Sequence, residues 1–103
     1  MKIHNKLVRD KIPDIIAAND ETAITHTLAD EEYLAELVKK LGEECTEFRE
    51  ALNMEELADI QEVVFALADA IGSRDELESA RATKAAARGT FTKRIFLEAT
   101  TRK

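Results

Sequence analysis

The sequence predicts a mainly α-helical fold, an antiparallel bundle of about four helices in one domain that covers residues 1–103. Gly and Pro are scarce, at 3 and 1 residues, while charged residues make up 35% of the chain and aromatic residues only 5%. This balance is typical of helix-rich proteins. Apolar residues also recur at alternating steps of three and four, the period of an amphipathic helix. Because so short a chain buries only a modest core, we expect it to complete that core by forming oligomers.

The first elements along the chain are predicted to be short. Pro13 suits the first turn of a helix that ends near residues 19–20. Residues 23–28 contain several β-branched side chains, which favour a strand. Residues 91–97 alternate weakly between polar and apolar and favour a second strand, so we expect the two strands to pair.

Two long helices are predicted in the middle of the chain. Asp30 is a suitable N-cap for a helix that extends to about Leu52. Asn53 is a suitable N-cap for the next helix, which Gly72 closes. In each helix the apolar residues share one side, and we expect this side to form the core. They are Leu34, Val38, Leu41, Cys45, Phe48 and Leu52 in the first helix, and Leu57, Ile60, Val64, Leu67 and Ile71 in the second.

The last predicted helix begins at a capping box. Ser73 is followed three positions later by Glu76, a spacing that lets each residue satisfy a free backbone N–H of the first turn. This helix is expected to extend to about Arg88, with Gly89 ending it.

Charge is distributed unevenly along the chain. Residues 20–80 hold 18 acidic and 4 basic side chains, a net charge of −14, whereas residues 81–103 hold 7 basic and 1 acidic, a net charge of +6. The acidic middle suits cations and argues against nucleic acid as a partner, because its phosphates would be repelled. The basic end suits an anion such as phosphate. The same charges also fit helix surfaces that simply face water.

Four acidic residues form the most informative pattern. Glu44 and Glu47 share one helix face at i, i+3, and so do Glu56 and Asp59. The short connection at Asn53 makes the two helices antiparallel, so both pairs lie at similar heights and their carboxylates can converge. Like charges this close need a cation, and oxygen ligands favour Mg²⁺ or Mn²⁺. The alternative is ordinary helix surface, with Glu56 serving only as the capping partner of Asn53.

Three segments resemble a known family. The run Glu43-Glu44-x-x-Glu47, followed by Glu56-x-x-Asp59, resembles the EExxE…ExxD signature of the all-α nucleoside triphosphate pyrophosphohydrolases, the MazG-like superfamily. The segment 5–13 (N-K-L-V-R-D-K-I-P) resembles the N-terminal motif of the phosphoribosyl-ATP pyrophosphohydrolase-like branch. The segment 84–97, Lys84-x-x-x-Arg88-Gly89-Thr90-Phe91-x-Lys93-Arg94-Ile95-Phe96-Leu97, resembles a motif of the same branch.

The resemblance implies a Mg²⁺-dependent hydrolase that cleaves the α–β phosphoanhydride of a nucleotide to a monophosphate and pyrophosphate, in a nucleotide house-cleaning role. Members of the family form homodimers or homotetramers. The implied metal ligands are Glu44, Glu47, Glu56 and Asp59. Glu43 or Glu47 would accept the proton of the attacking water. The residues expected to bind the substrate phosphates are Lys6, Arg9, Lys84, Arg88 and Lys93. Only residues 48–55 separate the acidic halves, and this short connection leaves the recognised base open.

Other classes of function remain as alternatives. One is a non-catalytic helical module that binds a nucleotide or a metal ion, and another is an interaction protein whose basic end touches nucleic acid. No apolar stretch is long enough to span a membrane, and the start lacks the apolar run of a signal peptide. A single cysteine excludes an internal disulfide, so we expect a cytoplasmic protein.

Overall fold

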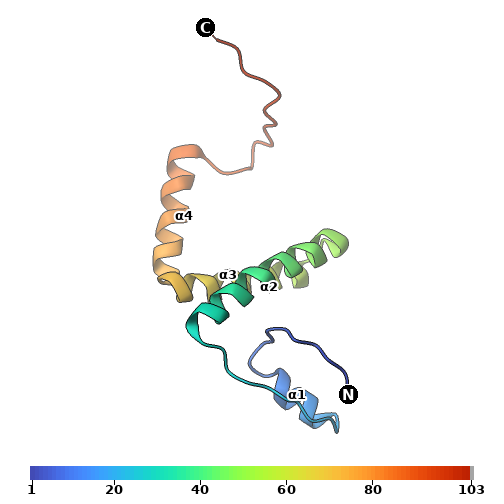
Figure 1. The fold of residues 1–103 in the computed structure, drawn as a ribbon. Helices are drawn as coiled ribbons and strands as arrows, with labels where there is room; N and C mark the ends of the chain where they lie inside the picture. Colours follow the sequence, from blue (N-terminus) through green and yellow to red (C-terminus); the bar gives the residue numbers. More distant parts are fainter. Residues whose placement is uncertain (103) are drawn as a thin grey trace.

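The structure is a computed structural model that describes residues 1–102. Its four helices are α1 (Ile12–Ala18), α2 (Asp30–Ala51), α3 (Met54–Ile71) and α4 (Arg74–Arg88), and Figure 1 shows their arrangement. The prediction of a mainly α-helical fold is confirmed. The strands predicted at 23–28 and 91–97 are wrong, because no strand forms anywhere in residues 1–102. These short segments lie apart in the fold, and an isolated pair of strands is marginal in water without a further strand or helix to cover it.

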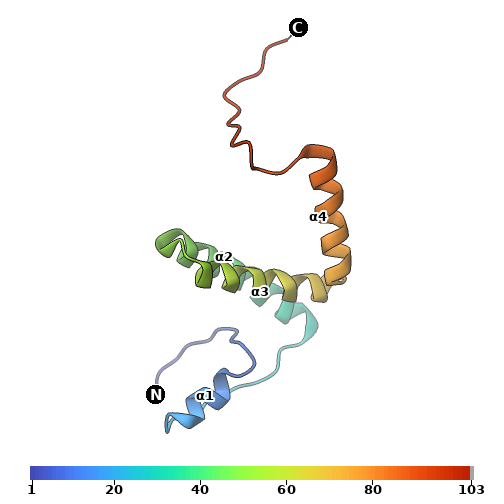
Figure 2. The same ribbon diagram turned by 180° about the vertical axis from the view of Figure 1, so that it is seen from behind.

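Helices α2 and α3 form an antiparallel hairpin, and the two views in Figures 1 and 2 show them side by side. Leu52 ends α2 in the left-handed conformation, with φ 48° and ψ 46°, and its N–H donates to the Phe48 carbonyl at 2.7 Å. The Asn53 side chain then accepts the Glu56 backbone N–H at 2.9 Å and caps α3 as predicted. Two residues therefore reverse the chain, which fixes the relative height of the two helices.

The core between α2 and α3 is small. Its buried apolar residues are Leu37, Val63 and Ala68. Val38 is 58% exposed and Cys45 is also exposed, so the prediction that they belong to the core is wrong. The side of α2 that packs on α3 is centred one residue earlier, about 100° around the helix. Most of the apolar residues that were predicted to form the core side of α2 consequently face outward.

Helix α4 is joined to α3 by a tight corner. Ser73 Oγ accepts the Glu76 backbone N–H at 3.1 Å, which confirms the predicted N-cap. The Arg74 guanidinium lies 4.6 Å from the centre of the Phe65 ring and 3.3 Å from an Asp69 carboxylate oxygen. Beyond this corner α4 leads away from the hairpin (Figures 1 and 2). The molecule is therefore elongated, with extents of 67 × 30 × 22 Å.

In residues 1–102 no helix is both long enough and apolar enough to cross a bilayer.

Candidate metal centre

Four carboxylates meet between α2 and α3. Glu44 and Glu47 come from α2, and Glu56 and Asp59 come from the first turns of α3. One carboxylate oxygen of each residue lies within 4.8 Å of those of the other three. Each pair shares a helix face through its i, i+3 spacing, and the short turn sets the two pairs at one height. The convergence predicted from the sequence is therefore present; we call these four residues the carboxylate cluster.

Part of the carboxylate cluster is buried without hydrogen-bond partners. Glu44 is only 8% exposed, although it is a charged residue on a helix with much free surface. Its Oε2 atom and the Oε2 atom of Glu56 are both buried, and neither has a hydrogen-bond partner. Leaving a buried acceptor unsatisfied costs about 1–3 kcal/mol, and more for a charged group. This arrangement fits a site whose ligand is a cation.

The electrostatics of the carboxylate cluster favour protonation when no cation is bound. Burial raises the pKa of Glu44, and the negative charge of Glu47 raises it further, while the nearby Lys40 ammonium opposes both effects. Burial also raises the pKa of Glu56, with added repulsion from Glu47 and Asp59. A divalent cation would reverse the balance, because it favours the ionised carboxylates.

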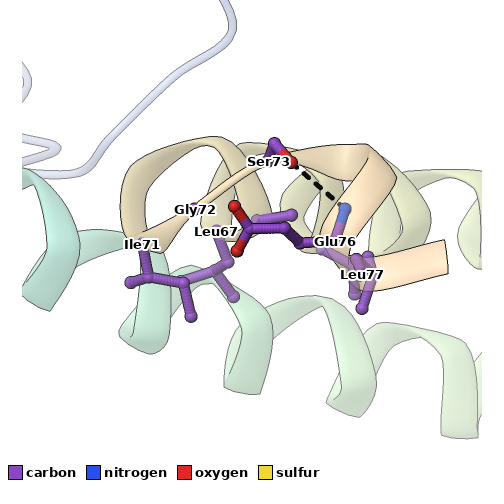
Figure 3. Close-up of a pocket in the computed structure, with 8 residues that line it drawn as sticks. Leu67, Ile71, Gly72, Ser73, Glu76 and Leu77 are labelled. Carbon is purple, nitrogen blue, oxygen red and sulfur yellow. Dashed lines mark hydrogen bonds between the residues drawn. The ribbon is translucent and has the colours of Figure 1, made fainter. Parts of the chain in front are cut away.

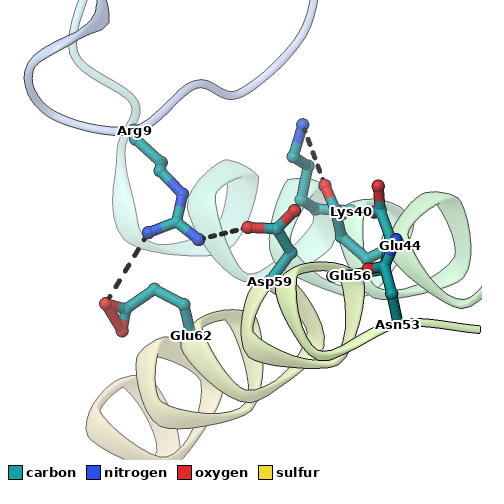
Figure 4. Close-up of polar contacts among 7 residues, drawn as sticks. All are labelled: Arg9, Lys40, Glu44, Asn53, Glu56, Asp59 and Glu62. Carbon is teal, nitrogen blue, oxygen red and sulfur yellow. Dashed lines mark hydrogen bonds and ion pairs between the residues drawn. The ribbon is translucent and has the colours of Figure 1, made fainter. Parts of the chain in front are cut away.

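Two basic side chains flank the carboxylate cluster, as Figure 4 shows. Lys40 Nζ lies 3.6 Å from Glu44 Oε1 and 3.8 Å from Glu43 Oε2. Arg9 Nη2 donates to Asp59 Oδ1 at 2.6 Å, so the N-terminal segment, residues 1–11, reaches the cluster. Glu43 therefore stands beside the cluster, linked to it through Lys40, and is not one of its four members.

The other predicted phosphate-binding residues lie elsewhere. From Asp59 to the end of α3 the helix rises about 18 Å, and α4 then continues away (Figure 2). Lys84 and Arg88 are on α4, and Lys93 follows it. Within one chain the structure thus brings Arg9 to the cluster but not these three residues. Lys6 is exposed in the segment before Arg9.

Two neighbours of the cluster were missed by the sequence analysis. Lys40 precedes Glu44 by four positions, a spacing that brings side chains together on a helix and could have identified it. Glu62 Oε1 lies 3.9 Å from Arg9 Nη1. No local pattern indicates that contact, because the two residues are 53 positions apart in the sequence.

Among residues 1–102, surface hollows also lie outside the carboxylate cluster. One, of about 290 Å³, occupies the corner between α3 and α4 and includes Leu67, Ile71 and Leu77 in its lining (Figure 3). Another, of about 380 Å³, is lined by Met54, Leu57, Ala58 and Gln61 of α3. Both are mainly apolar and suit apolar side chains better than phosphate groups.

Part of this chain is similar to a known protein. A stretch of 46 residues is 50% identical to a protein of Mycolicibacterium smegmatis (strain ATCC 700084 / mc(2)155) that is described as uncharacterized. The match covers 45% of this chain and 47% of that protein, so the chain spans about half the length of the curated relative. No family model matches the chain, and no solved structure matches it.

Proposed function

We propose that this protein is a divalent-metal-dependent nucleotide pyrophosphohydrolase of the MazG-like superfamily, in the phosphoribosyl-ATP pyrophosphohydrolase-like branch. One observation carries the proposal. Four of the five acidic residues of the EExxE…ExxD pattern converge to within 4.8 Å, and two of their oxygens are buried without partners. Burial of carboxylate oxygens without partners is unfavourable, and this distinguishes the cluster from acidic groups that only face water.

The donor atoms support a hard cation, Mg²⁺ or Mn²⁺. All four candidate ligands are carboxylates, and hard divalent ions prefer oxygen ligands. Softer metals such as zinc more often take nitrogen or sulfur from His or Cys. When bound, such an ion stabilises developing phosphate charge and lowers the pKa of a coordinated water. Phosphoanhydride hydrolysis needs both of these effects.

The residues around the carboxylate cluster supply the remaining functions. Glu47 is the most exposed of the four carboxylates, which suits it to accept a proton from an attacking water at the open side of the cluster. Glu43 is the alternative base, and Lys40 holds it beside Glu44. Arg9 reaches the same edge and can donate to a phosphate oxygen of the substrate.

A homo-oligomer, as a dimer or tetramer, is part of this proposal. Among residues 1–102 the buried apolar core consists of Leu37, Val63 and Ala68, which is little for a chain of this length. Large apolar residues such as Leu52, Met54 and Ile71 remain exposed. A second copy would cover such surface. In such an oligomer, Lys84 and Arg88 of one chain would be able to reach the substrate of a neighbouring chain.

The test is pyrophosphate release from a panel of nucleoside triphosphates and phosphoribosyl-ATP, with and without MgCl₂. The proposal expects a monophosphate and pyrophosphate from at least one of them, and only with the metal. A folded protein that binds a nucleotide and Mg²⁺ without turnover would instead support the non-catalytic binding module. The absence of both binding and turnover would remove the proposed function altogether.

A further inference from the structure

The contact between Arg9 and the carboxylate cluster joins two otherwise separate parts of the molecule. Arg9 Nη2 lies 2.6 Å from Asp59 Oδ1, and Nη1 lies 3.9 Å from Glu62 Oε1. Within the described part of the chain, no other hydrogen bond or side-chain ion pair links residues 1–28 to residues 30–88. Helix α1 also packs against no other described helix. Within the described residues, Arg9 therefore supplies the polar side-chain contacts that hold the N-terminal segment, residues 1–11, against the hairpin.

The ion pair between Arg9 and Asp59 is exposed to water, so another cation can replace Arg9 at little cost. The side chains of Arg9 and Asp59 are 56% and 38% exposed, so water screens their attraction. An exposed ion pair contributes only about 0.2–1 kcal/mol. A dipositive ion at the carboxylate cluster would act on the same carboxylate with twice the charge of Arg9, and it would also repel the guanidinium.

We infer that Arg9 is a displaceable counter-ion of the carboxylate cluster. It neutralises Asp59 in the metal-free chain, leaves when a divalent cation is bound, and thereby releases the N-terminal segment. The inference rests on the proposed metal centre and adds a coupling to it: metal binding and the position of residues 1–11 control each other. The freed guanidinium is then available to pair with an anionic substrate.

Thermodynamic linkage makes the sign of this coupling measurable. If a bound cation weakens the contact of Arg9 with Asp59, the contact must weaken cation binding by the same factor. Removal of the guanidinium charge should then tighten cation binding. A residue that only orients Asp59 as a ligand would have the opposite effect, because its loss would weaken binding. The direction of change separates a displaceable counter-ion from a positioning residue.

The first measurement is calorimetric titration of the full chain with MgCl₂. We expect Arg9→Gln to bind Mg²⁺ about two- to five-fold more tightly than the wild type, the size of an exposed ion pair. Lys11→Gln is the matched control, because Lys11 carries the same charge two positions further on and has no ion pair in residues 1–102. Its affinity should stay within about 1.5-fold of the wild type, as expected for screened surface charges.

The second measurement follows the N-terminal segment itself by backbone ¹⁵N relaxation. Addition of MgCl₂ should lower the heteronuclear NOE of residues 5–11 in the wild type, and these values should already be low in Arg9→Gln. Equal or weaker Mg²⁺ binding by Arg9→Gln, beside a wild type that binds, would overturn the inference and leave the proposed function intact. A wild type that binds no divalent cation would overturn both.

Discussion

The helical hairpin and the two ends of the chain differ in what determines their structure. In α2 and α3, local periodicity and a two-residue turn place four carboxylates together. The ends, residues 1–29 and 89–102, contain one short helix and otherwise no regular structure. They hold most of the basic residues that were predicted to bind phosphate, yet only Arg9 reaches the carboxylate cluster. The comparison teaches that the carboxylate cluster is a property of the hairpin, whereas the proposed binding of substrate depends on how the ends are positioned.

The largest expected effect is on activity, and it tests the part of the comparison that concerns the hairpin. Glu44→Gln keeps the shape of the side chain but removes a buried charge from the carboxylate cluster. Pyrophosphate release should fall by at least about 100-fold, beyond the 10–100-fold typical of residues that only support a ligand. Glu50→Gln, an exposed position on the same helix, is the control and should retain activity. Loss of activity in both variants would indicate a general charge effect.

The next largest effect concerns stability and compares two faces of α2. Leu37 is 3% exposed and Val38 is 58% exposed. Leu37→Ala should lower the free energy of unfolding by about 2–5 kcal/mol, the cost of a cavity in the core. Val38→Ala should change it by less than about 1 kcal/mol, because little area is lost. Urea denaturation at a concentration where the chain is monomeric measures both, and equal losses would contradict the observed orientation of α2.

A smaller effect tests whether the basic end of the chain, residues 81–103, takes part in binding the nucleotide. Lys84→Gln combined with Arg88→Gln should raise KM for the nucleotide about five- to ten-fold, the net scale of one ordinary hydrogen bond, and leave Mg²⁺ affinity unchanged. Steady-state kinetics and Mg²⁺ titration distinguish these quantities. A change in metal affinity with unchanged KM would show that α4 acts on the carboxylate cluster and does not bind substrate.

The smallest effect is a dependence of stability on pH. The pKa of Glu44 is raised from its usual 4.5 by burial and by Glu47, so between pH 4.5 and the raised pKa the folded metal-free chain retains a proton that the unfolded chain loses. This contribution to stability is fully present below about pH 4.5 and is lost as the pH rises through the raised pKa. Glu44→Gln should therefore increase the urea midpoint of the metal-free chain at pH 7, and the gain should disappear below pH 4.5. A gain that is the same at both pH values would contradict this assignment.

The sequence predicted the hairpin well because its determinants are local. The caps at Asn53 and Ser73 and the i, i+3 acidic pairs depend on residues within one or two helical turns. The orientation of α2 was predicted less well, since a shift of one residue exchanges Leu37 for Val38 in the core. That choice depends on how side chains of α2 fit against α3, which periodicity alone does not determine.

The terminal regions were predicted least well because they depend on contacts over long distances in the sequence. The β-branched run at 23–28 and the apolar residues at 91–97 favoured strands, but a strand requires a partner, and neither segment finds one among residues 1–102. The contact of Arg9 with Asp59 spans 50 positions. Only the resemblance of residues 5–13 to a family motif indicated that Arg9 belonged to the site.

The central claim is that the carboxylate cluster is a divalent-cation site, and Glu55 and Glu56 provide its most direct test. They are adjacent glutamates in the first turn of α3, but only Glu56 belongs to the cluster. Calorimetric titration with MnCl₂ should show binding by the wild type and by Glu55→Gln, and at least a ten-fold loss of affinity in Glu56→Gln, about the scale of a lost support for a metal ligand. Equal affinities for the two variants, or no binding by the wild type, would contradict the claim.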